Sequence, residues 1–336
     1  MFDPEIHSSA VGITSTIPVE IILAGGFKPV DLNNLFITSE MPEKLIRQAE
    51  SEGFAHNICA WIKGIYATVI NHHVKTVIAV TGGDCSNTVA LSELFLCRGV
   101  RIIPFHYPIN HRREPLSDQL KELGEALSAT WPQIVRTKTR LDRIRRKLIE
   151  VDKLTYEQNV VTGLENHRFL VSSSDFASDP DQYEADLDVF LGEARRREPK
   201  GKEIRLGYLG VPPIFEGFYE TIESLGARVV FNEVQRQFSM PYEEEDIVAQ
   251  YLRYTYPYEI GGRIQDIKEA IEERRLDGLI HYTQTFCFRQ IHDIILREYL
   301  PLPMLTLEGD RPGIIDARTA ARLEIFIEML KDRKWG

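Results

Sequence analysis

Three cysteines stand where a folded chain can present a thiolate. Cys59 begins an amphipathic stretch, Cys85 follows an apolar run that ends in Gly-Gly-Asp, and Cys287 follows a second apolar run. We expect each thiol to emerge near the N-terminus of a helix, where the dipole and the unpaired N–H groups favour thiolate over thiol. The same N–H groups can donate hydrogen bonds to cluster sulfides. These residue types therefore indicate metal or iron–sulfur chemistry if the three thiols converge.

The cysteines alone leave other interpretations open. Taken singly, a cysteine is most often a small buried hydrophobe. Cys97, which follows three apolar residues in a predicted helix, fits that description, and we expect it to pack toward a sheet. Zinc would need a fourth ligand such as His56, His106 or His281. An iron–sulfur cubane would use three thiolates and leave one iron open. Composition does not separate these alternatives.

The elements that must position the cysteines follow a βα rhythm, which predicts an α/β fold with parallel sheets. In the first half we expect strands at 11–14, 28–32, 76–81 and 101–105, with helices at 18–24, 43–49, 57–71 and 87–98. In the second half we expect strands at 204–210, 228–232, 278–282 and 304–307, with helices at 215–225, 262–274, 288–298 and 317–330.

The charged stretch between the two halves has helical spacing and almost no β-branched runs. We therefore predict a first α/β domain at 1–114, a helical connector or cap at 115–202, and a second α/β domain at 203–336. Ligands of open α/β sheets bind outside the carboxyl ends of the strands. Cys85 and Cys287 both follow predicted strands, so a cleft between the two domains is the expected meeting point.

Composition narrows the classes of function. The 336 residues carry a net charge of −10 at pH 7, which argues against a nucleic-acid binder. No apolar stretch approaches about 18 residues, so we expect no membrane span. The N-terminal segment lacks the features of a secretory signal, which predicts a cytoplasmic protein with reduced thiols. Dinucleotide, P-loop, zinc-protease and serine-hydrolase motifs are missing from the sequence.

Six separated blocks of sequence, in this order, resemble the subunits of the 2-hydroxyacyl-CoA dehydratase and benzoyl-CoA reductase family. The blocks are TIPVEIILAGGFKPVDL, HNICAWIKG, VIAVTGGDCSNTVALSEL followed by IIPFHYP, GYLGVPPIFEGFYETIESLGARVVFNE, RLDGLIHYTQTFC and LTLEGDRPGIIDARTAARLEIFIEML. The resemblance implies two Rossmann-like or flavodoxin-like domains with a [4Fe–4S]-type cluster between them. The family's cluster cysteines fall on Cys59, Cys85 and Cys287.

The resemblance also implies an activity and partners. Family members receive a low-potential electron from a separate ATP-dependent iron–sulfur activator and reduce an acyl-CoA thioester to a ketyl radical. They work as homodimers or as heterodimers with a sister subunit. Some relatives instead carry a double-cubane cluster and reduce small molecules. Because this chain has four cysteines, a double cubane would need ligands from a second subunit or from other groups.

Glu20 lies in the PVE segment that resembles the family's P-x-E block, and we expect it to move a proton near the open iron. The alternative is an ordinary glutamate in the first turn of a helix. Other residues are candidates for contacts with substrate or cluster, although each also suits a cap or a loop. They are Ser15, Thr16, Thr283, Gln284 and Glu308. A more distant alternative is a cluster-free, two-domain protein that binds a ligand in its cleft.

Overall fold

The computed structural model describes residues 9–201 and 203–336. These residues form two compact units that are not continuous in sequence. The first unit contains residues 9–146, 172–184 and 240–259, and the second contains the other described residues. The predicted domain boundaries after residues 114 and 202 stay a prediction, because the compactness of a unit does not show which segments fold independently.

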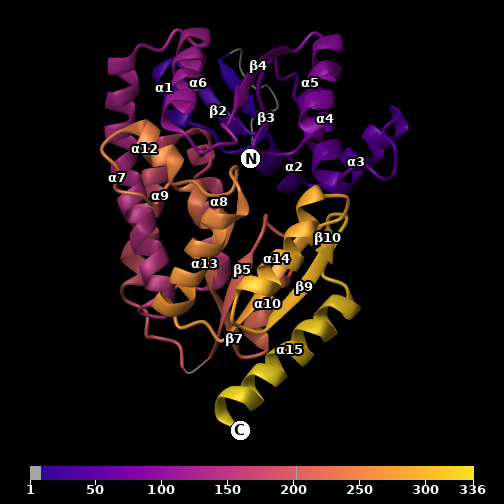
Figure 1. Ribbon diagram of the computed structural model, residues 1–336, viewed down its shortest axis with the longest axis vertical. Helices are drawn as coiled ribbons and strands as arrows, with labels where there is room; N and C mark the ends of the chain where they lie inside the picture. The colour runs from indigo at the N-terminus through magenta and orange to yellow at the C-terminus, as the bar shows by residue number, and fades with distance from the viewer. Residues whose placement is uncertain (1–8, 202) are drawn as a thin grey trace. The chain divides into compact units, whose positions relative to one another are not determined.

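The first unit is built on a four-stranded sheet in the order β2-β1-β3-β4, with all neighbours parallel (Figure 1). The central strands are almost entirely buried, as expected for parallel strands covered by helices on both faces. The strands are β1 (Ala10–Ile13), β2 (Lys28–Asp31), β3 (Thr76–Gly82) and β4 (Arg101–His106).

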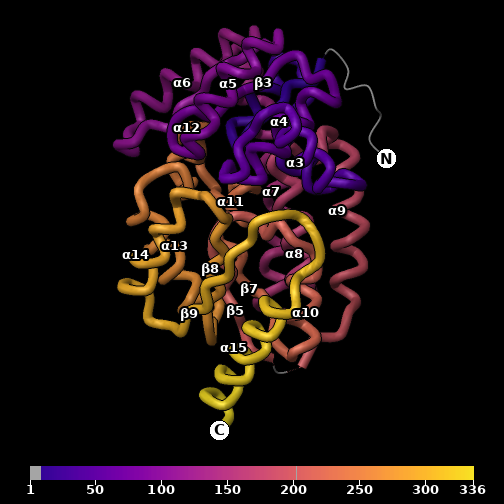
Figure 2. Tube along the Cα trace, turned by 90° about the vertical axis from the view of Figure 1, so that its right-hand side faces the viewer, coloured from indigo at the N-terminus to yellow at the C-terminus, as the bar shows by residue number. Residues whose placement is uncertain are grey.

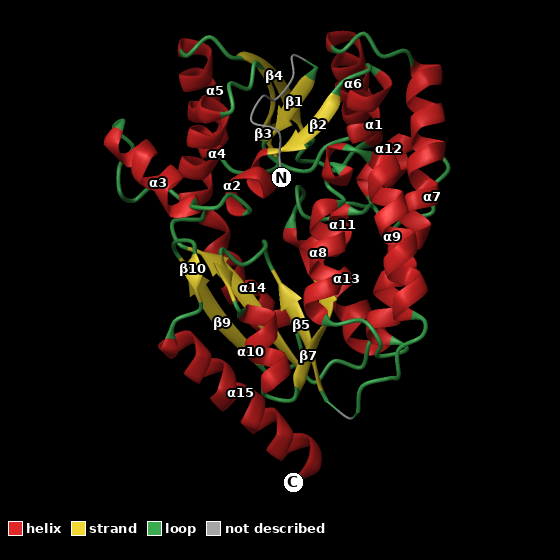
Figure 3. Ribbon diagram, turned by 180° about the vertical axis from the view of Figure 1, so that it is seen from behind, coloured by secondary structure: helices red, strands yellow, loops and turns green. Residues whose placement is uncertain are grey.

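Helices cover both faces of this first sheet. In Figure 3, α4 and α5 lie on one side of the strands and α1 and α6 lie on the other, and each pair is in contact. The helices are α1 (Val19–Ala24), α2 (Leu32–Ile37), α3 (Pro42–Ser51), α4 (Ala60–Asn71), α5 (Asn87–Cys97), α6 (Arg113–Ala126) and α12 (Ile247–Leu252), with a short 3-10 turn η1 (Phe176–Ser178).

The second unit has a four-stranded parallel sheet in the order β7-β5-β8-β9 and a separate two-stranded sheet, β10-β6. Every residue of β7 and β8 is buried, which again indicates cover on both faces. The strands are β5 (Ile204–Leu209), β6 (Phe215–Glu216), β7 (Ala227–Asn232), β8 (Gly278–Gln284), β9 (Met304–Gly309) and β10 (Gly313–Ile314).

Figure 2 shows this second sheet between α13 and α14 on one face and α10 and α15 on the other, and the members of each pair touch. No described helix is both long and apolar enough to cross a membrane. The helices are α10 (Phe218–Ser224), α11 (Glu233–Phe238), α13 (Ile260–Glu273), η2 (Phe288–Ile291), α14 (His292–Tyr299) and α15 (Ala317–Trp335).

In three further helices, one part of the helix belongs to the first unit and the other part to the second. The first segment of the first unit ends at Arg146, within a helix that continues in the second unit. The predicted helical character of the charged stretch is confirmed in these three helices. They are α7 (Trp131–Tyr156), α8 (Gly163–Ser172) and α9 (Pro180–Ala194).

The predicted α/β class and its parallel sheets are confirmed. Two details of the prediction are wrong. The segment expected as one helix at 215–225 begins as strand β6, and its helix starts at Phe218. Cys97 is exposed at the end of α5 and does not pack toward the sheet, because the residues of that helix which face the core are Leu91 and Phe95.

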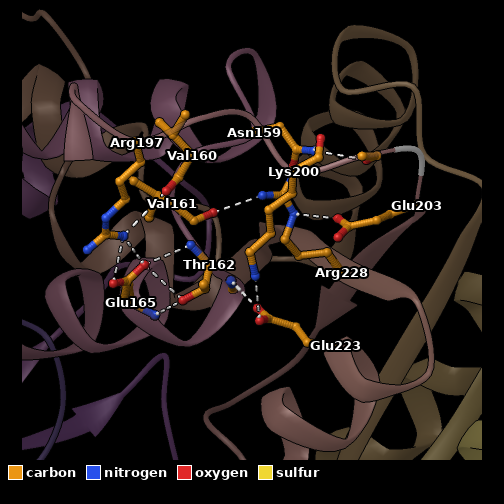
Figure 4. A network of polar contacts seen from close by, with 12 residues as sticks. Asn159, Val160, Val161, Thr162, Glu165, Arg197, Lys200, Glu203, Glu223 and Arg228 are labelled. Atoms are coloured by element: carbon orange, nitrogen blue, oxygen red, sulfur yellow. Dashed lines mark hydrogen bonds and ion pairs between the residues drawn. The ribbon is translucent and has the colours of Figure 1, made fainter.

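A polar network fixes the amino ends of β5 and β7 in the second unit (Figure 4). Arg228 is 1% exposed, and its guanidinium donates to the Val161 carbonyl at 3.0 Å. The same guanidinium pairs with Glu203 at 3.3 Å. Nearby, Arg197 pairs with Glu165 at 2.8 Å. These contacts lie at the end of the sheet opposite to the carboxyl ends, so we assign them a structural role.

Gly210 follows β5 directly and has a φ of +98°, which L side chains rarely adopt. A Cβ at this position would lie 2.4 Å from the carbonyl oxygen of Tyr282 on the neighbouring strand β8. Only glycine therefore allows the chain to leave β5 across the end of β8.

We predict that Gly210→Ala lowers the free energy of unfolding by at least about 2 kcal/mol, because it combines backbone strain with a clash. Urea denaturation of the purified protein measures this. Gly192→Ala is the matched control, since nothing lies within 4 Å of the added Cβ and the helix α9 should gain roughly 0.5–1 kcal/mol. An equal response of the two variants would contradict the assignment.

Candidate functional site

Cys59 is the residue immediately before α4 and is 7% exposed. Its surroundings are the apolar cluster of the first unit that includes Tyr66, Leu91 and Phe95. Helix α4 is buried on nearly all sides, so its N-terminus and the Cys59 thiol are held firmly. The predicted position of this cysteine at a helix start is confirmed.

Cys85 lies in the loop between β3 and α5 and packs against the same apolar cluster as Cys59. Its carbonyl accepts a hydrogen bond from Thr88 N at 3.0 Å, which opens α5. Gly83, at a φ of +88°, shapes the loop, because a Cβ there would lie 2.8 Å from the Cβ of Tyr107. Two of the three predicted ligands, Cys59 and Cys85, therefore lie against the same group of apolar side chains in the first unit.

Cys287 belongs to the second unit and directly precedes η2. A tight turn presents it, in which Cys287 N donates to the Gln284 carbonyl at 3.0 Å. Phe286 within this turn has a φ of +64°, a strained conformation for an aromatic residue. Both Phe286 and Phe288 are about half exposed, so the turn holds its cysteine between two accessible rings.

None of the four cysteines forms a disulfide. Within the described residues of either unit, no three His, Cys, Asp or Glu side chains gather into a metal site. The histidines considered as zinc ligands have other neighbours: His56 lies 3.6 Å from Glu50, His106 lies 3.1 Å from Thr81 Oγ1, and His281 lies 2.7 Å from Asp293. Cys59 and Cys85 belong to the first unit and Cys287 to the second, so the convergence of the three thiols stays a prediction.

Glu20 is completely buried at the start of α1 and is held by three side chains of the first unit. Its Oε1 pairs with the Arg145 guanidinium at 2.7 Å and accepts from Gln250 Nε2 at 3.0 Å. Its Oε2 accepts from the Tyr251 hydroxyl at 2.9 Å. The carboxylate therefore joins α1 to α7 and α12, and proton transfer at Glu20 stays a prediction.

The remaining predicted residues hold loops in the structure. Thr16 is buried, and its carbonyl accepts from the Tyr107 hydroxyl at 2.9 Å, while Ser15 is half-buried. Thr283 Oγ1 donates to the Leu307 carbonyl at 3.2 Å, and Gln284 Nε2 donates to the Asp310 carbonyl at 2.9 Å. Glu308 is exposed and accepts from Thr285 Oγ1 at 3.2 Å. Contacts of these residues with a ligand stay a prediction.

Sequence reasoning missed a pair of buried carboxyl groups in the first unit. Asp31, at the end of β2, donates its backbone N–H to the carboxylate of Asp175 at 2.7 Å. Ser174 Oγ donates to the Asp31 carboxylate at 2.6 Å. Both acids are 5% exposed. Burial, together with the charge of Asp31, raises the pKa of Asp175 to about 7, and burial also raises the pKa of Asp31.

The backbone beside this pair is unusual. Phe176, Ala177 and Ser178 have φ values of 51°, 50° and 62°, so three consecutive residues other than glycine adopt the left-handed conformation. Asp175 holds the turn by accepting from Ala177 N at 2.9 Å, and Ser178 Oγ donates to the Pro29 carbonyl at 2.7 Å. Asp31 follows a short apolar strand in the sequence, but nothing in the sequence connects it with a residue 144 positions away.

We predict that Glu20→Gln lowers the free energy of unfolding by about 2–4 kcal/mol, because it leaves the buried Arg145 charge with only Asp142, 3.1 Å away and partly exposed, as its carboxylate partner. Urea denaturation checks this. The control is Glu43→Gln, which breaks an exposed pair with Arg47 and should cost under about 0.5 kcal/mol. A Glu20→Gln protein as stable as wild type would contradict the structural role of the pair.

The buried acid pair predicts a pH dependence of stability. The pKa of Asp175 is higher in the folded protein than its ordinary value of 3.8, so the folded state retains a proton that the unfolded state releases. Stability should therefore fall as pH rises from about 4 to about 7, by up to about 1.4 kcal/mol per pH unit. Urea denaturation at pH 5 and pH 7.5 measures the slope.

Asp175→Asn should reduce this slope, whereas Asp118→Asn, at an exposed position of α6, should leave it unchanged. An unchanged slope in Asp175→Asn would show that groups other than Asp175 cause the pH dependence of stability.

Comparison with known families places these cysteines in context. The family model described as 2-hydroxyglutaryl-CoA dehydratase, D-component, matches residues 14–330, which include Cys59, Cys85 and Cys287. No curated protein matches the chain at a significant level. The match extends over both units and over nearly the whole chain. The chain therefore belongs to the 2-hydroxyglutaryl-CoA dehydratase D-component family.

Proposed function

We propose that this chain is the iron–sulfur subunit of a 2-hydroxyacyl-CoA dehydratase-type system and that Cys59, Cys85 and Cys287 hold its cluster. The proposal rests on the position that the three cysteines have in common. Each cysteine stands in the loop directly before a helix, and all three lie within the residues that the family model matches. Cys97 differs, because it lies at the C-terminal end of a helix and is exposed.

The donor set fits an iron–sulfur cluster in its chemistry. Thiolates are the usual ligands of such clusters, and three of them leave one iron open. Cys59 and Cys85 border one apolar cluster of the first unit, which lowers the local dielectric and excludes water. When bound, the cluster would supply a low-potential single electron and a Lewis-acidic iron.

The protein's own residues have separate tasks in this proposal. Gln284 fixes the loop before Cys287, since its carbonyl accepts from Cys287 N and its side chain bonds to the Asp310 carbonyl. Glu20, Gln250 and Tyr251 hold α1 against the rest of the first unit. We also propose Glu20 as the group that handles a proton, although its pairing with Arg145 means that such a role requires movement of the arginine.

The proposal includes partners that family membership supports. A D-component implies a system with a further subunit, so we propose a dimer, either of two copies or with a sister chain. An ATP-dependent iron–sulfur activator would deliver the electron, and an acyl-CoA thioester would be the substrate. Reduced thiols fit a cytoplasmic protein.

The test is the iron and acid-labile sulfide content of protein purified without oxygen. We predict about four irons per chain for the wild type and for the control Cys97→Ser, as expected for one cubane. Cys59→Ser, Cys85→Ser and Cys287→Ser should each lose most of the iron, because each removes one of three ligands. Circular dichroism of the variants would show that the fold is retained.

Other iron contents would change the proposal in defined ways. About eight irons per chain would indicate a double cubane and a small-molecule reductase. Full iron retention in a variant that lacks Cys59, Cys85 and Cys287 together would contradict the ligand assignment. A wild-type protein without iron or sulfide would contradict the iron–sulfur function itself.

A further inference from the structure

A histidine and an aspartate form a close pair in the second unit, on the strand before Cys287 and the helix after it, and the proposed function gives neither of them a role. His281 lies on β8 and is 3% exposed. Its Nδ1 is 2.7 Å from the Asp293 carboxylate on α14. A carboxylate at this distance accepts a hydrogen bond from Nδ1–H and so fixes the tautomer in which Nε2 carries the lone pair.

Asp293 is itself held on several sides. Its carboxylate accepts from Thr306 Oγ1 on β9 at 2.6 Å and from Arg297 Nε at 2.8 Å. Burial raises the pKa of Asp293, but the hydrogen bonds from His281, Thr306 and Arg297 outweigh it and lower the pKa well below its usual range. The carboxylate therefore stays ionised, and the imidazole ring has one orientation.

The position of His281 in the sheet is the one at which α/β folds place ligands. In the order β7-β5-β8-β9, the chain turns to one side after β5 and to the other side with β8, so the topological switch point lies between β5 and β8. His281 pairs in register with Leu209, the last residue of β5. His281 is thus level with the carboxyl end of β5, the end of the strands at which open α/β sheets bind their ligands.

Two observations indicate that the Nε2 edge of the ring is kept open. Nε2 has no hydrogen-bond partner among the described residues, and it does not belong to the fully buried polar atoms that lack one, so it keeps contact with the surface. The residue that follows β5 is Gly210, which places no side chain beside this edge of the ring; a Cβ there would lie 3.8 Å from His281 Cδ2, the carbon bonded to Nε2.

The charged groups around His281 come from α11, α13 and α14, and they pair among themselves. Glu233 of α11 is bound by both sides of the Arg263 guanidinium at 2.6 Å and 2.8 Å. Arg263 also lies 3.2 Å from His292 Nδ1. Burial, followed by the charge of Arg263, lowers the pKa of His292 to about 4, so that ring is neutral at pH 7. The Glu233 carboxylate is thus bound by Arg263, and the Asp293 carboxylate is bound by His281 Nδ1. Neither carboxylate forms a hydrogen bond with His281 Nε2.

We propose that His281 exchanges a proton with an acyl substrate at the carboxyl edge of the second sheet, with Asp293 as its positioning residue. The inference rests on the proposed function for the nature of that substrate, a 2-hydroxyacyl thioester. It goes beyond that function because it assigns removal of the C3 proton to a histidine of the second unit, whereas Glu20 is proposed for a different proton, near the open iron.

The proposed reaction is the loss of water from the 2-hydroxyacyl thioester. The C2–O and C3–H bonds of the substrate break, a C2=C3 double bond forms, and water leaves. The C3–H bond becomes acidic only after the thioester has accepted one electron from the activator, and the hydroxyl group then leaves C2 as hydroxide. The unprotonated Nε2 accepts the C3 proton, and the resulting imidazolium gives it to the hydroxide, which leaves as water. There is no net oxidation or reduction, and the electron from the activator is recovered at the end of each turnover.

The test uses cluster-loaded, oxidised protein and 2-hydroxyglutaryl-CoA as the probe. Calorimetry measures binding of the probe, and NMR of protein labelled with ¹⁵N-histidine follows the His281 ring. We expect 2-hydroxyglutaryl-CoA to shift the Nε2 resonance of His281, whereas CoA alone leaves it in place. Asp293→Asn should show a mixture of the two ring tautomers.

Activity with the activator supplies the second measurement. His281→Asn keeps a side-chain N–H toward Asp293 but removes Nε2, so kcat should fall about 100-fold while KM and iron content change little. His73→Asn is the control, because His73 is exposed and asparagine tolerates its left-handed backbone. Asp293→Asn should also lower kcat more than it raises KM.

The outcomes separate this inference from the proposed function. Binding of 2-hydroxyglutaryl-CoA without any change at Nε2, or full kcat in His281→Asn, would overturn the role of His281 and leave the dehydratase function in place. A cluster-loaded protein that does not bind the probe would contradict the proposed substrate class, and the inference would fall with it.

Discussion

Parallel pairing of strands is the constraint on which the rest of each unit depends. A parallel strand cannot be followed by its neighbour through a tight turn, so a helix must return the chain across the sheet. Each strand therefore ends in a loop that leads into the N-terminus of a helix. Cys85 follows β3 and Cys287 follows β8 for this reason. The topology places these two cysteines just before the N-terminus of a helix, although they are far apart in the sequence.

Buried ion pairs connect the helices to one another within each unit. Glu20 and Arg145 join α1 to α7 in the first unit, and Glu233 and Arg263 join α11 to α13 in the second. Such pairs contribute little net stability relative to apolar residues of similar size, but loss of one partner is costly because the other charge stays buried. Each pair joins two helices that are far apart in the sequence.

Much of the fold could be predicted from local patterns. The strands of both sheets are short apolar runs bounded by polar turns, and α13 and α15 have clear helical periodicity. The short helices α11 and α12 were beyond prediction, because six residues do not establish a period. Cys97 was assigned to the core wrongly, since three preceding apolar residues do not show which of them faces the sheet.

The candidate site was predictable only in part, for a related reason. That Cys59 precedes a helix follows from its own segment, and this is confirmed. The partners of Glu20 lie 125 to 231 residues away, and the pairs of Asp31 with Asp175 and of His281 with Asp293 also require the fold. Polar contacts between distant elements leave no periodic signal in one sequence. The resemblance to a family singles out Cys59, Cys85 and Cys287 as the proposed ligands, whereas local patterns alone leave a buried-hydrophobe or zinc interpretation open.

We propose above that Cys59, Cys85 and Cys287 hold one iron–sulfur cluster. The most direct measurement is a crystal structure of the protein purified without oxygen, with anomalous scattering recorded at the iron edge. The account predicts a single iron–sulfur cluster whose irons are bound by the Sγ atoms of Cys59, Cys85 and Cys287. Iron bound by other side chains, or the three Sγ atoms far apart in a crystal that contains the cluster, would contradict it.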